Sequence, residues 1–326
     1  MRKLSIIFIL LLIILFILFL IFFPFGGKVA KEEEKIIQEA EISREEGGGE
    51  TEQKLKIVNF STFFPIKNGG YSLINLGEKS GIAILFTNQG EEEILYQKNI
   101  DEEIPIASLT KLISAMVVMD SYPLEKEVEV SREAVLTLGE SGRLSPSEKI
   151  SIRGLLDLTL LVSSNDAASA LAEIIGKEKF IDLMNEKIEE IGIQNTHFMN
   201  SHGLDEKDHY STVSDLALIT QYSIIHYPEI WEILGTEEKD VIGKDNLGRE
   251  ILHHLRNTNK LLLEEGVFGG KTGYTEDAGD CMILAMEAPG KVRGNIAIVI
   301  LGVGIGERIP KTKQLYDWIR NAYIWE

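Results

Sequence analysis

The stretch Ile104-Pro-Ile-Ala-Ser-Leu-Thr-Lys-Leu112 places a serine and a lysine one helical turn apart. Pro105 interrupts the chain, and apolar residues then recur at helical spacing, namely Leu109, Leu112, Ile113, Met116 and Val117. A buried helix therefore begins near Ser108, where free backbone N–H groups can stabilise a developing oxyanion. The amine of Lys111 can reach the Ser108 hydroxyl, because residues three apart lie on one side of a helix.

This Ser-x-x-Lys pattern has two interpretations. In the first, Ser108 is a nucleophile and Lys111 is its base, which requires surroundings that favour an uncharged amine. In the second, Ser108 is an ordinary helix cap and Lys111 is a solvated charge. Serine and lysine are common residues, so this motif alone does not decide between the two.

Two further motifs follow in order. Ser163-Ser-Asn165 lies between two apolar helical runs, so we expect it in a loop or at a helix start. Lys271-Thr-Gly273 lies in the glycine-rich segment 269–275, and glycines beside a strand let a ligand come close. Lys271 offers a positive charge to a substrate carboxylate, and Thr272 offers a hydrogen bond. The alternatives are capping residues for the first motif and a plain glycine-rich hairpin for the second.

Lys79-Ser80-Gly81 fits the same short pattern as the third motif. It precedes the serine motif, and we interpret it as a turn without a catalytic role. The evidence for a site is therefore the order of all three motifs, each in a suitable local context.

The order of predicted elements indicates the fold class. Residues 82–96 predict a hairpin, helical segments fill the middle, and apolar strands return after Gly270, at 281–286 and 296–301. This order predicts an α+β fold in which both ends of the domain complete one antiparallel sheet, with a helical lobe beside it. Residues 58–326 are ample for such a domain.

The three ordered motifs resemble those of the penicillin-recognising serine enzymes. Their surroundings resemble one branch, the D-alanyl-D-alanine carboxypeptidase family of low-molecular-mass penicillin-binding proteins (serine peptidase family S11). The similar segments, within about residues 70–322, are Ile104–Leu112, Ser163–Ala168, Ala170–Glu173, Thr196–Asn200, Gly203–Leu204, Ser211–Ala217, Asn257–Leu261 and Gly269–Thr275. The resemblance implies a β-lactamase/transpeptidase-like fold.

The resemblance also implies catalytic roles. Ser108 would attack the carbonyl between two D-alanines and form an acyl-enzyme. Lys111 would take the serine proton, and Ser163 would pass a proton to the leaving amine. The implied substrates are peptidoglycan stem peptides, and β-lactam antibiotics would act as covalent inhibitors.

The implied substrate-binding residues are Asn165, Lys271, Thr272, Gly273, Tyr274 and Arg308. Asn165 would hold the substrate amide, and Lys271 with Thr272 would hold the terminal carboxylate. Backbone N–H groups of Ser108 and Tyr274 would form the oxyanion hole. Arg308, ten residues before Trp318, falls where the family often has a second carboxylate-binding residue.

Other activities stay open at this point. The chain ends at Glu326, so we expect neither the family's usual C-terminal β-domain nor its terminal anchor helix; shorter members include D,D-endopeptidases. A serine β-lactamase would need a deacylating glutamate, and Glu186, Glu189 and Glu190 lie in a helical run without that family's context. A non-catalytic penicillin- or muropeptide-binding protein would not need the full set of catalytic side chains.

Residues 4–25 form an almost wholly apolar run, long enough to cross a bilayer. Two basic residues precede it, which favours a cytoplasmic N-terminus with the bulk of the chain outside the cell membrane. We therefore expect a cytoplasmic tip and transmembrane anchor at 1–27, an acidic flexible tether at 28–57 and an extracytoplasmic catalytic domain at 58–326. A cleaved signal peptide is the alternative, but its apolar core would be shorter and end at small residues.

Composition narrows the partners. The formal net charge of −18 argues against nucleic acid. The histidines and the single cysteine match no metal-ligand spacing, so we expect neither a metal nor another cofactor. We expect most of the six histidines at the surface and Cys281 in the core of a strand. Ser164 stands where the family usually has glycine, and we expect little effect from it.

Overall fold

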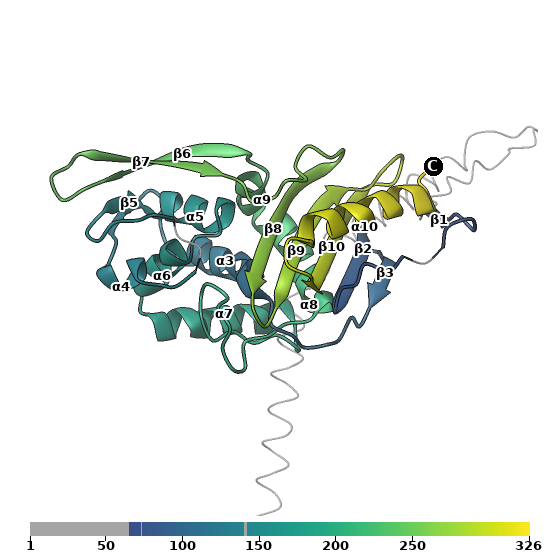
Figure 1. The fold of residues 1–326 in the computed structure, drawn as a ribbon, viewed down its shortest axis with the longest axis horizontal. Helices are drawn as coiled ribbons and strands as arrows, with labels where there is room; N and C mark the ends of the chain where they lie inside the picture. The colour runs from purple at the N-terminus through teal and green to yellow at the C-terminus, as the bar shows by residue number, and fades with distance from the viewer. Residues whose placement is uncertain (1–64, 73, 140–141) are drawn as a thin grey trace, which may run out of the picture. The chain divides into compact units, whose positions relative to one another are not determined.

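The computed structural model describes residues 65–326, except 73, 140 and 141. Its centre is a five-stranded antiparallel sheet with the order β3-β2-β10-β9-β8 (Figure 1). The strands are β2 (Ser80–Thr87), β3 (Glu92–Lys98), β8 (Val267–Thr275), β9 (Gly279–Glu287) and β10 (Gly294–Val303). Because β2 pairs with β10, both ends of the domain complete one sheet, as the sequence predicts.

The middle of the chain forms the predicted helical lobe. It contains the 3-10 helix η1 (Ala107–Thr110) and the α-helices α3 (Lys111–Ser121), α4 (Arg132–Val135), α5 (Ile152–Leu161), α6 (Asn165–Glu173), α7 (Lys177–Ile191), α8 (Val213–His226) and α9 (Pro228–Leu234). The last helix, α10 (Arg308–Ala322), covers the opposite face of the sheet from α8 (Figure 1).

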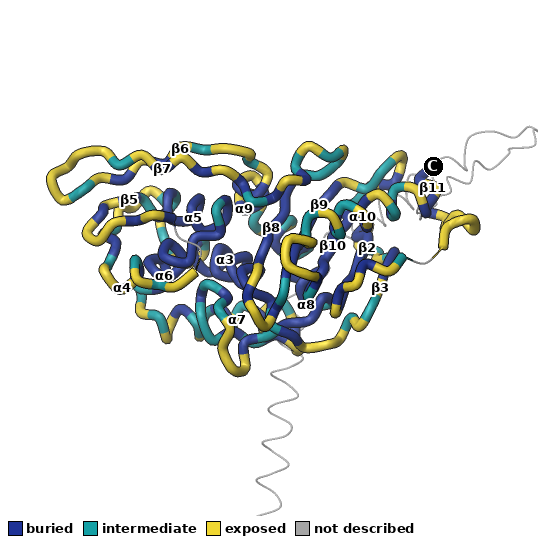
Figure 2. Tube along the Cα trace, viewed as in Figure 1, coloured by how far each residue is buried: buried dark blue, intermediate teal, exposed yellow. Residues whose placement is uncertain are grey.

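The central strands are buried on both faces, which explains their unbroken apolar runs. Along β10, Ala297 and Val299 join the core of the helical lobe, whereas Ile296 and Ile298 join the core beneath α10. Figure 2 shows β9, β10 and α3 as mostly buried. Cys281 on β9 is fully buried, which confirms its predicted place in the core.

A second sheet, of order β4-β5-β6-β7, was not predicted. Its strands are β4 (Glu127–Glu129), β5 (Lys149–Ser151), β6 (Glu238–Lys244) and β7 (Glu250–Arg256). β4 and β5 have 3 residues each. The outward face of the β6–β7 hairpin is exposed (Figure 2), and most of its residues are charged. Neither feature gives a long apolar signal. A separate pair joins β1 (Ile66–Lys67) to β11 (Tyr323–Ile324).

The Lys79-Ser80-Gly81 sequence is not a turn, contrary to the prediction. Ser80 and Gly81 begin β2 and pair with Leu301 and Ile300 of β10. A side chain at Gly81 would lie 3.2 Å from the Tyr96 ring, so a glycine suits this position in the strand.

The expectation of mostly solvated histidines is also wrong. Only His226 and His254 are exposed, while His209 and His253 are buried. Each buried ring has a polar partner, since His209 bonds a threonine hydroxyl and His253 lies 2.6 Å from the Glu148 carboxylate. Buried polar groups require such partners, and residue spacing alone did not reveal them.

Within 65–326, leaving aside positions 73, 140 and 141, no helix is both long enough and apolar enough to span a bilayer. The predicted anchor at 1–27 and tether at 28–57 lie outside the described residues. The predicted catalytic domain at 58–326 is described from residue 65 onward.

Candidate active site

Ser108 and Lys111 lie together where η1 continues into α3. Ser108 is 8% exposed and Lys111 is fully buried. The Lys111 Nζ lies 2.7 Å from the Ser108 Oγ, 2.6 Å from the Asn165 Oδ1 and 2.6 Å from the His202 carbonyl oxygen. The first two motifs therefore meet at one amine.

The orientation of Asn165 follows from its second partner. Its Nδ2 donates to the Leu138 carbonyl at 2.7 Å, so its Oδ1 faces Lys111. The Asn165 Oδ1 and the His202 carbonyl oxygen can only accept hydrogen bonds. A neutral amine has two N–H donors and one lone pair, so it can donate to these two acceptors and present its lone pair to the Ser108 proton. The amine is fully buried, and the role of a base requires its neutral form.

The backbone before Ser108 is held in an unusual conformation. Ala107 has a φ of 50°, which is uncommon for a residue with a side chain. The Thr110 hydroxyl donates to the Ala107 carbonyl at 2.9 Å and lies 2.8 Å from the His209 Nε2. The Met199 N–H donates to the His209 Nδ1 at 3.1 Å, so the proton of the neutral ring is on Nε2 and points to Thr110. This chain of hydrogen bonds supports the nucleophile segment.

His209 should make the fold sensitive to acid. Burial, with a smaller contribution from His197, lowers the pKa of His209 to about 4 from 6.5. The folded state thus binds a proton more weakly than the unfolded state, so stability is lost as the pH falls through 6.5 toward 4. Between pH 7 and pH 5 we expect His209 to cost on the order of 2 kcal/mol of the free energy of unfolding.

Urea unfolding of wild type and His209→Gln at the two pH values measures this cost. The variant should be less stable at pH 7 but should lose less stability on acidification. An equal loss in both proteins would contradict the assignment. His202, whose pKa burial lowers to about 3, is unchanged in the variant and accounts for part of the remaining loss.

Ser163 and Lys271 form a second pair beside the first. Ser163 lies between α5 and α6 with a φ of 60°, and its Oγ lies 2.7 Å from the Lys271 Nζ. Both residues are buried. Ser164 caps α6, because its Oγ accepts the Ala167 N–H at 3.0 Å. The position of the second motif at a helix start was predicted, and the cap shows how a serine at position 164 fits there.

The third motif lies on β8, an edge strand of the central sheet. A side chain at Gly273 would lie 2.8 Å from the Ser108 backbone nitrogen, so only glycine lets β8 approach the nucleophile this closely. Thr272 is buried, and its Oγ1 lies 2.7 Å from the Thr258 Oγ1. Tyr274 is 42% exposed at the rim. The three motifs therefore surround one short stretch of strand edge.

Arg308 begins α10 and reaches this strand from behind the motif. Its Nη1 donates to the Gly273 carbonyl at 3.2 Å and to the Asp280 Oδ1 at 2.9 Å. Asp280 is buried on β9. The guanidinium thus lies next to the third motif and is paired there with a carboxylate of the protein, and its role toward a substrate stays a prediction.

Two backbone carbonyls in the site were missed from sequence. Those of His202 and Leu138 position Lys111 and Asn165, and a carbonyl leaves no mark on residue type. The nearest sequence signal was Gly203, which belongs to the family-like segment Gly203–Leu204. In the structure its φ is 87°, which suits glycine. A side chain at Gly203 would lie 1.9 Å from the Ala107 carbonyl oxygen.

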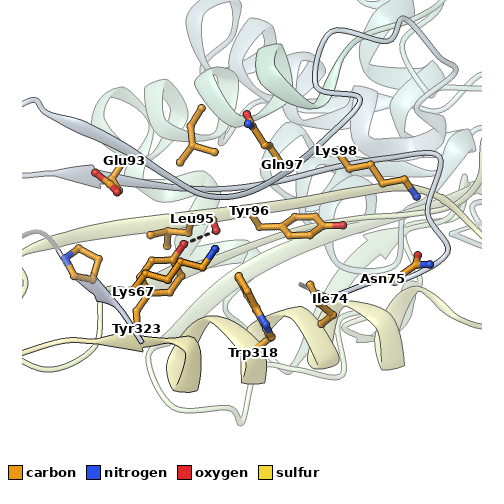
Figure 3. Close-up of a pocket in the computed structure, with 12 residues that line it drawn as sticks. Lys67, Ile74, Asn75, Glu93, Leu95, Tyr96, Gln97, Lys98, Trp318 and Tyr323 are labelled. Atoms are coloured by element: carbon orange, nitrogen blue, oxygen red, sulfur yellow. Dashed lines mark hydrogen bonds between the residues drawn. The ribbon is translucent and has the colours of Figure 1, made fainter. Parts of the chain in front are cut away.

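A groove of about 660 Å³ lies elsewhere, along β3 at the other edge of the sheet from β8 (Figure 3). Tyr96, Trp318 and Tyr323 line it, and the Tyr323 hydroxyl donates to the Leu95 carbonyl at 2.6 Å. None of the predicted site residues lines this groove. The catalytic side chains and the groove are therefore separate features.

Several known proteins are similar to this chain in sequence. A family model described as D-alanyl-D-alanine carboxypeptidase matches residues 77–303. The D-alanyl-D-alanine carboxypeptidase DacF of Bacillus subtilis is 31% identical over 82% of this chain and 69% of its own length. The D-alanyl-D-alanine endopeptidase of Pseudomonas aeruginosa is 35% identical over 75% of this chain and 78% of its own length.

Solved structures agree on the fold. The Streptomyces K15 DD-transpeptidase aligns with a TM-score of 0.70 at 24% identity, over 77% of this chain and 99% of that chain. The D-alanyl-D-alanine carboxypeptidase DacD of Francisella tularensis aligns with a TM-score of 0.66 at 26% identity, over 76% of this chain and 71% of that chain. The predicted transpeptidase-like architecture, of mixed α and β content with an antiparallel sheet, is confirmed. By its sequence match and its fold, this chain belongs to the D-alanyl-D-alanine carboxypeptidase family.

Proposed function

We propose that this protein is a serine D-alanyl-D-alanine carboxypeptidase acting on peptidoglycan stem peptides. One observation carries the proposal: the Lys111 amine lies 2.7 Å from the Ser108 hydroxyl, while two pure acceptors take up its N–H groups. That arrangement provides a nucleophile with an adjacent base. The names of its relatives supply the substrate class.

Acylation follows from this geometry. The Ser108 proton passes to Lys111 as Oγ attacks the carbonyl carbon between the last two D-alanines. Charge on the carbonyl oxygen is stabilised by the N–H groups of Ser108 and Tyr274. Because Lys271 donates to the Ser163 oxygen, the Ser163 proton is free to move to the departing amine, and D-alanine leaves. Ser163 regains a proton from the Lys111 ammonium, so that Lys111 is neutral again before water attacks. Water then cleaves the ester, with Lys111 again accepting a proton.

Asn165, Lys271 and Thr272 would orient the substrate. The Asn165 amide is fixed between Lys111 and the Leu138 carbonyl, so it is pre-positioned to bond the peptide. Lys271 and Thr272 supply the charge and hydroxyl for the terminal carboxylate. Gly273 has no side chain, which lets the β8 backbone lie close to Ser108. Arg308, held by Asp280 beside the Gly273 carbonyl, is a further candidate for a hydrogen bond to that carboxylate.

The full chain in detergent, incubated with a D-Ala-D-Ala-terminated pentapeptide, tests this function. Wild type should release D-alanine and take up fluorescent penicillin, and Ser108→Ala should do neither. Equal labelling of the variant would show that Ser108 is not the nucleophile. Release of D-alanine by Ser108→Ala would show that Ser108 is not needed for the reaction.

Cleavage of peptidoglycan cross-links is a second candidate. It is favoured by the Pseudomonas aeruginosa endopeptidase, which has the higher identity of the two relatives described above. Intact sacculi decide between the two. Loss of cross-linked dimers with little D-alanine released from pentapeptide would indicate an endopeptidase, and the reverse would indicate a carboxypeptidase.

Rapid β-lactam hydrolysis is not expected. Glu186, Glu189 and Glu190 are exposed on α7, and Glu190 is paired with Lys187 and Tyr222, so none of them has the place of a deacylating base beside Ser108. Benzylpenicillin should therefore leave a long-lived adduct on Ser108, detectable by intact mass. Fast steady-state turnover of benzylpenicillin would overturn this expectation and favour a β-lactamase.

We also propose that residues 1–27 anchor the protein in the cell membrane, that 28–57 form a tether and that the catalytic domain is extracytoplasmic. The apolar run at 4–25 and the basic residues before it support this topology. Cell fractionation tests it. The full chain should sediment with membranes and be digested by protease added to spheroplasts, and a protected or soluble protein would contradict the proposal.

A further inference from the structure

The Thr272 hydroxyl contacts a residue outside the three motifs, Thr258. Its Oγ1 lies 2.7 Å from the Thr258 Oγ1. Thr258 also donates its backbone N–H to the Leu161 carbonyl at 3.1 Å, at the end of α5 and just before Ser163. Thr258 thus links β8, which carries the third motif, to α5, the helix that precedes the second motif.

The segment that carries Thr258 is held rigidly on both sides. The Asn257 side chain donates to the Leu234 carbonyl at 2.9 Å and accepts the Asn259 N–H at 2.8 Å. The Asn259 Oδ1 accepts the Leu261 N–H at 2.9 Å. Asn257 and Asn259 are buried, whereas Thr258 between them is half-buried. The Thr258 hydroxyl is therefore pre-positioned, and placing it costs little when a ligand arrives.

The approach of this segment to β8 is close. A side chain at Gly270 would lie 2.8 Å from the Asn259 Nδ2, so the glycine allows the contact. Lys271 points instead to Ser163, on the alternate face of the strand. Thr272 is thus supported by the Asn257–Leu261 segment rather than by the catalytic helices.

We propose that Thr258 is a positioning residue that orients the Thr272 hydroxyl toward the carboxylate of the substrate. This inference rests on the proposed function. A hydroxyl has one proton, so in the free pair one threonine donates and the other accepts. A bound carboxylate takes the Thr272 proton in a charge-assisted bond, and Thr258 then donates its own proton to the Thr272 oxygen. Each bond in such a chain strengthens the next.

Without the Thr258 hydroxyl, the Thr272 oxygen loses its donor in the bound state. Thr258→Val keeps the shape of the side chain and should raise the KM for the D-Ala-D-Ala peptide about tenfold, with kcat within about twofold of wild type. Thr258→Ser keeps the hydroxyl and should restore KM. The concentration of benzylpenicillin, also a carboxylate, that gives half-maximal acylation should rise in parallel.

Thr236→Val is the matched control, because the Thr236 hydroxyl bonds the Glu232 carbonyl and not a site residue. The same peptide with a C-terminal carboxamide is the second control, since wild type and Thr258→Val should then have equal KM. Release of D-alanine by wild type tests the proposed function itself. With active wild type, an unchanged KM in Thr258→Val, an equal rise on the carboxamide, or a fall in kcat alone would overturn the role of Thr258.

Discussion

Replacing Lys111 with methionine should slow acylation of Ser108 by benzylpenicillin about 10³-fold, the typical contribution of a well-placed general base. Methionine has nearly the length of lysine and suits a fully buried site, but it has no lone pair on nitrogen to accept the Ser108 proton. The variant also leaves the Asn165 Oδ1 and the His202 carbonyl without their shared donor. A modest loss of stability should therefore accompany the loss of rate.

The rate is measured by fluorescent penicillin labelling over time, with the adduct identified by intact mass. Circular dichroism checks that the variant is folded. Lys79→Met is the matched control, because Lys79 is an exposed lysine just before β2 and contacts none of the site residues named above. Labelling at the wild-type rate in Lys111→Met would remove Lys111 from the role of base.

The parts of the site that could be predicted are those with a direct chemical signature. Ser108 and Lys111 are candidates because a nucleophile and its base need particular residue types one helical turn apart, and the family resemblance adds Ser163 as a relay. The structure places the Lys111 amine and the Lys271 amine against serine hydroxyls at 2.7 Å each. The central sheet could also be predicted, because strands buried on both faces produce unbroken apolar runs.

What could not be predicted is determined by backbone atoms and by tertiary contacts. The His202 carbonyl holds Lys111, yet any residue at position 202 supplies a carbonyl. Most cross-strand pairs on the outward face of the β6–β7 hairpin are charged, such as Asp240 with His254. The hairpin therefore has no regular apolar alternation from which its strands could be predicted. Thr258 could be placed beside Thr272 only from the fold, since the two are 14 positions apart in sequence.

The loop that presents the His202 carbonyl depends on Gly203. Its N–H donates to the Asn200 Oδ1 at 2.7 Å, and its φ of 87° turns the chain toward the nucleophile segment. A side chain at Gly203 would lie 1.9 Å from the Ala107 carbonyl oxygen and 2.9 Å from the Thr110 Oγ1. Both neighbours are fixed, because the Thr110 hydroxyl bonds that same carbonyl. The clash can be relieved only by moving the loop or the nucleophile segment.

Gly203→Ala should therefore cost about 4 kcal/mol or more of the free energy of unfolding, a loss typical of severe strain in a packed region. Gly192→Ala isolates the backbone contribution, because Gly192 has a φ of 83° at the end of α7 but no atom within 4 Å of its would-be side chain. It should cost only about 1–2 kcal/mol. Urea unfolding followed by tryptophan fluorescence measures both. Any folded Gly203→Ala should also acylate slowly, because the carbonyl that orients Lys111 is displaced. Equal costs in the two variants would show that backbone conformation alone, and not the approach to Ala107, makes glycine necessary at position 203.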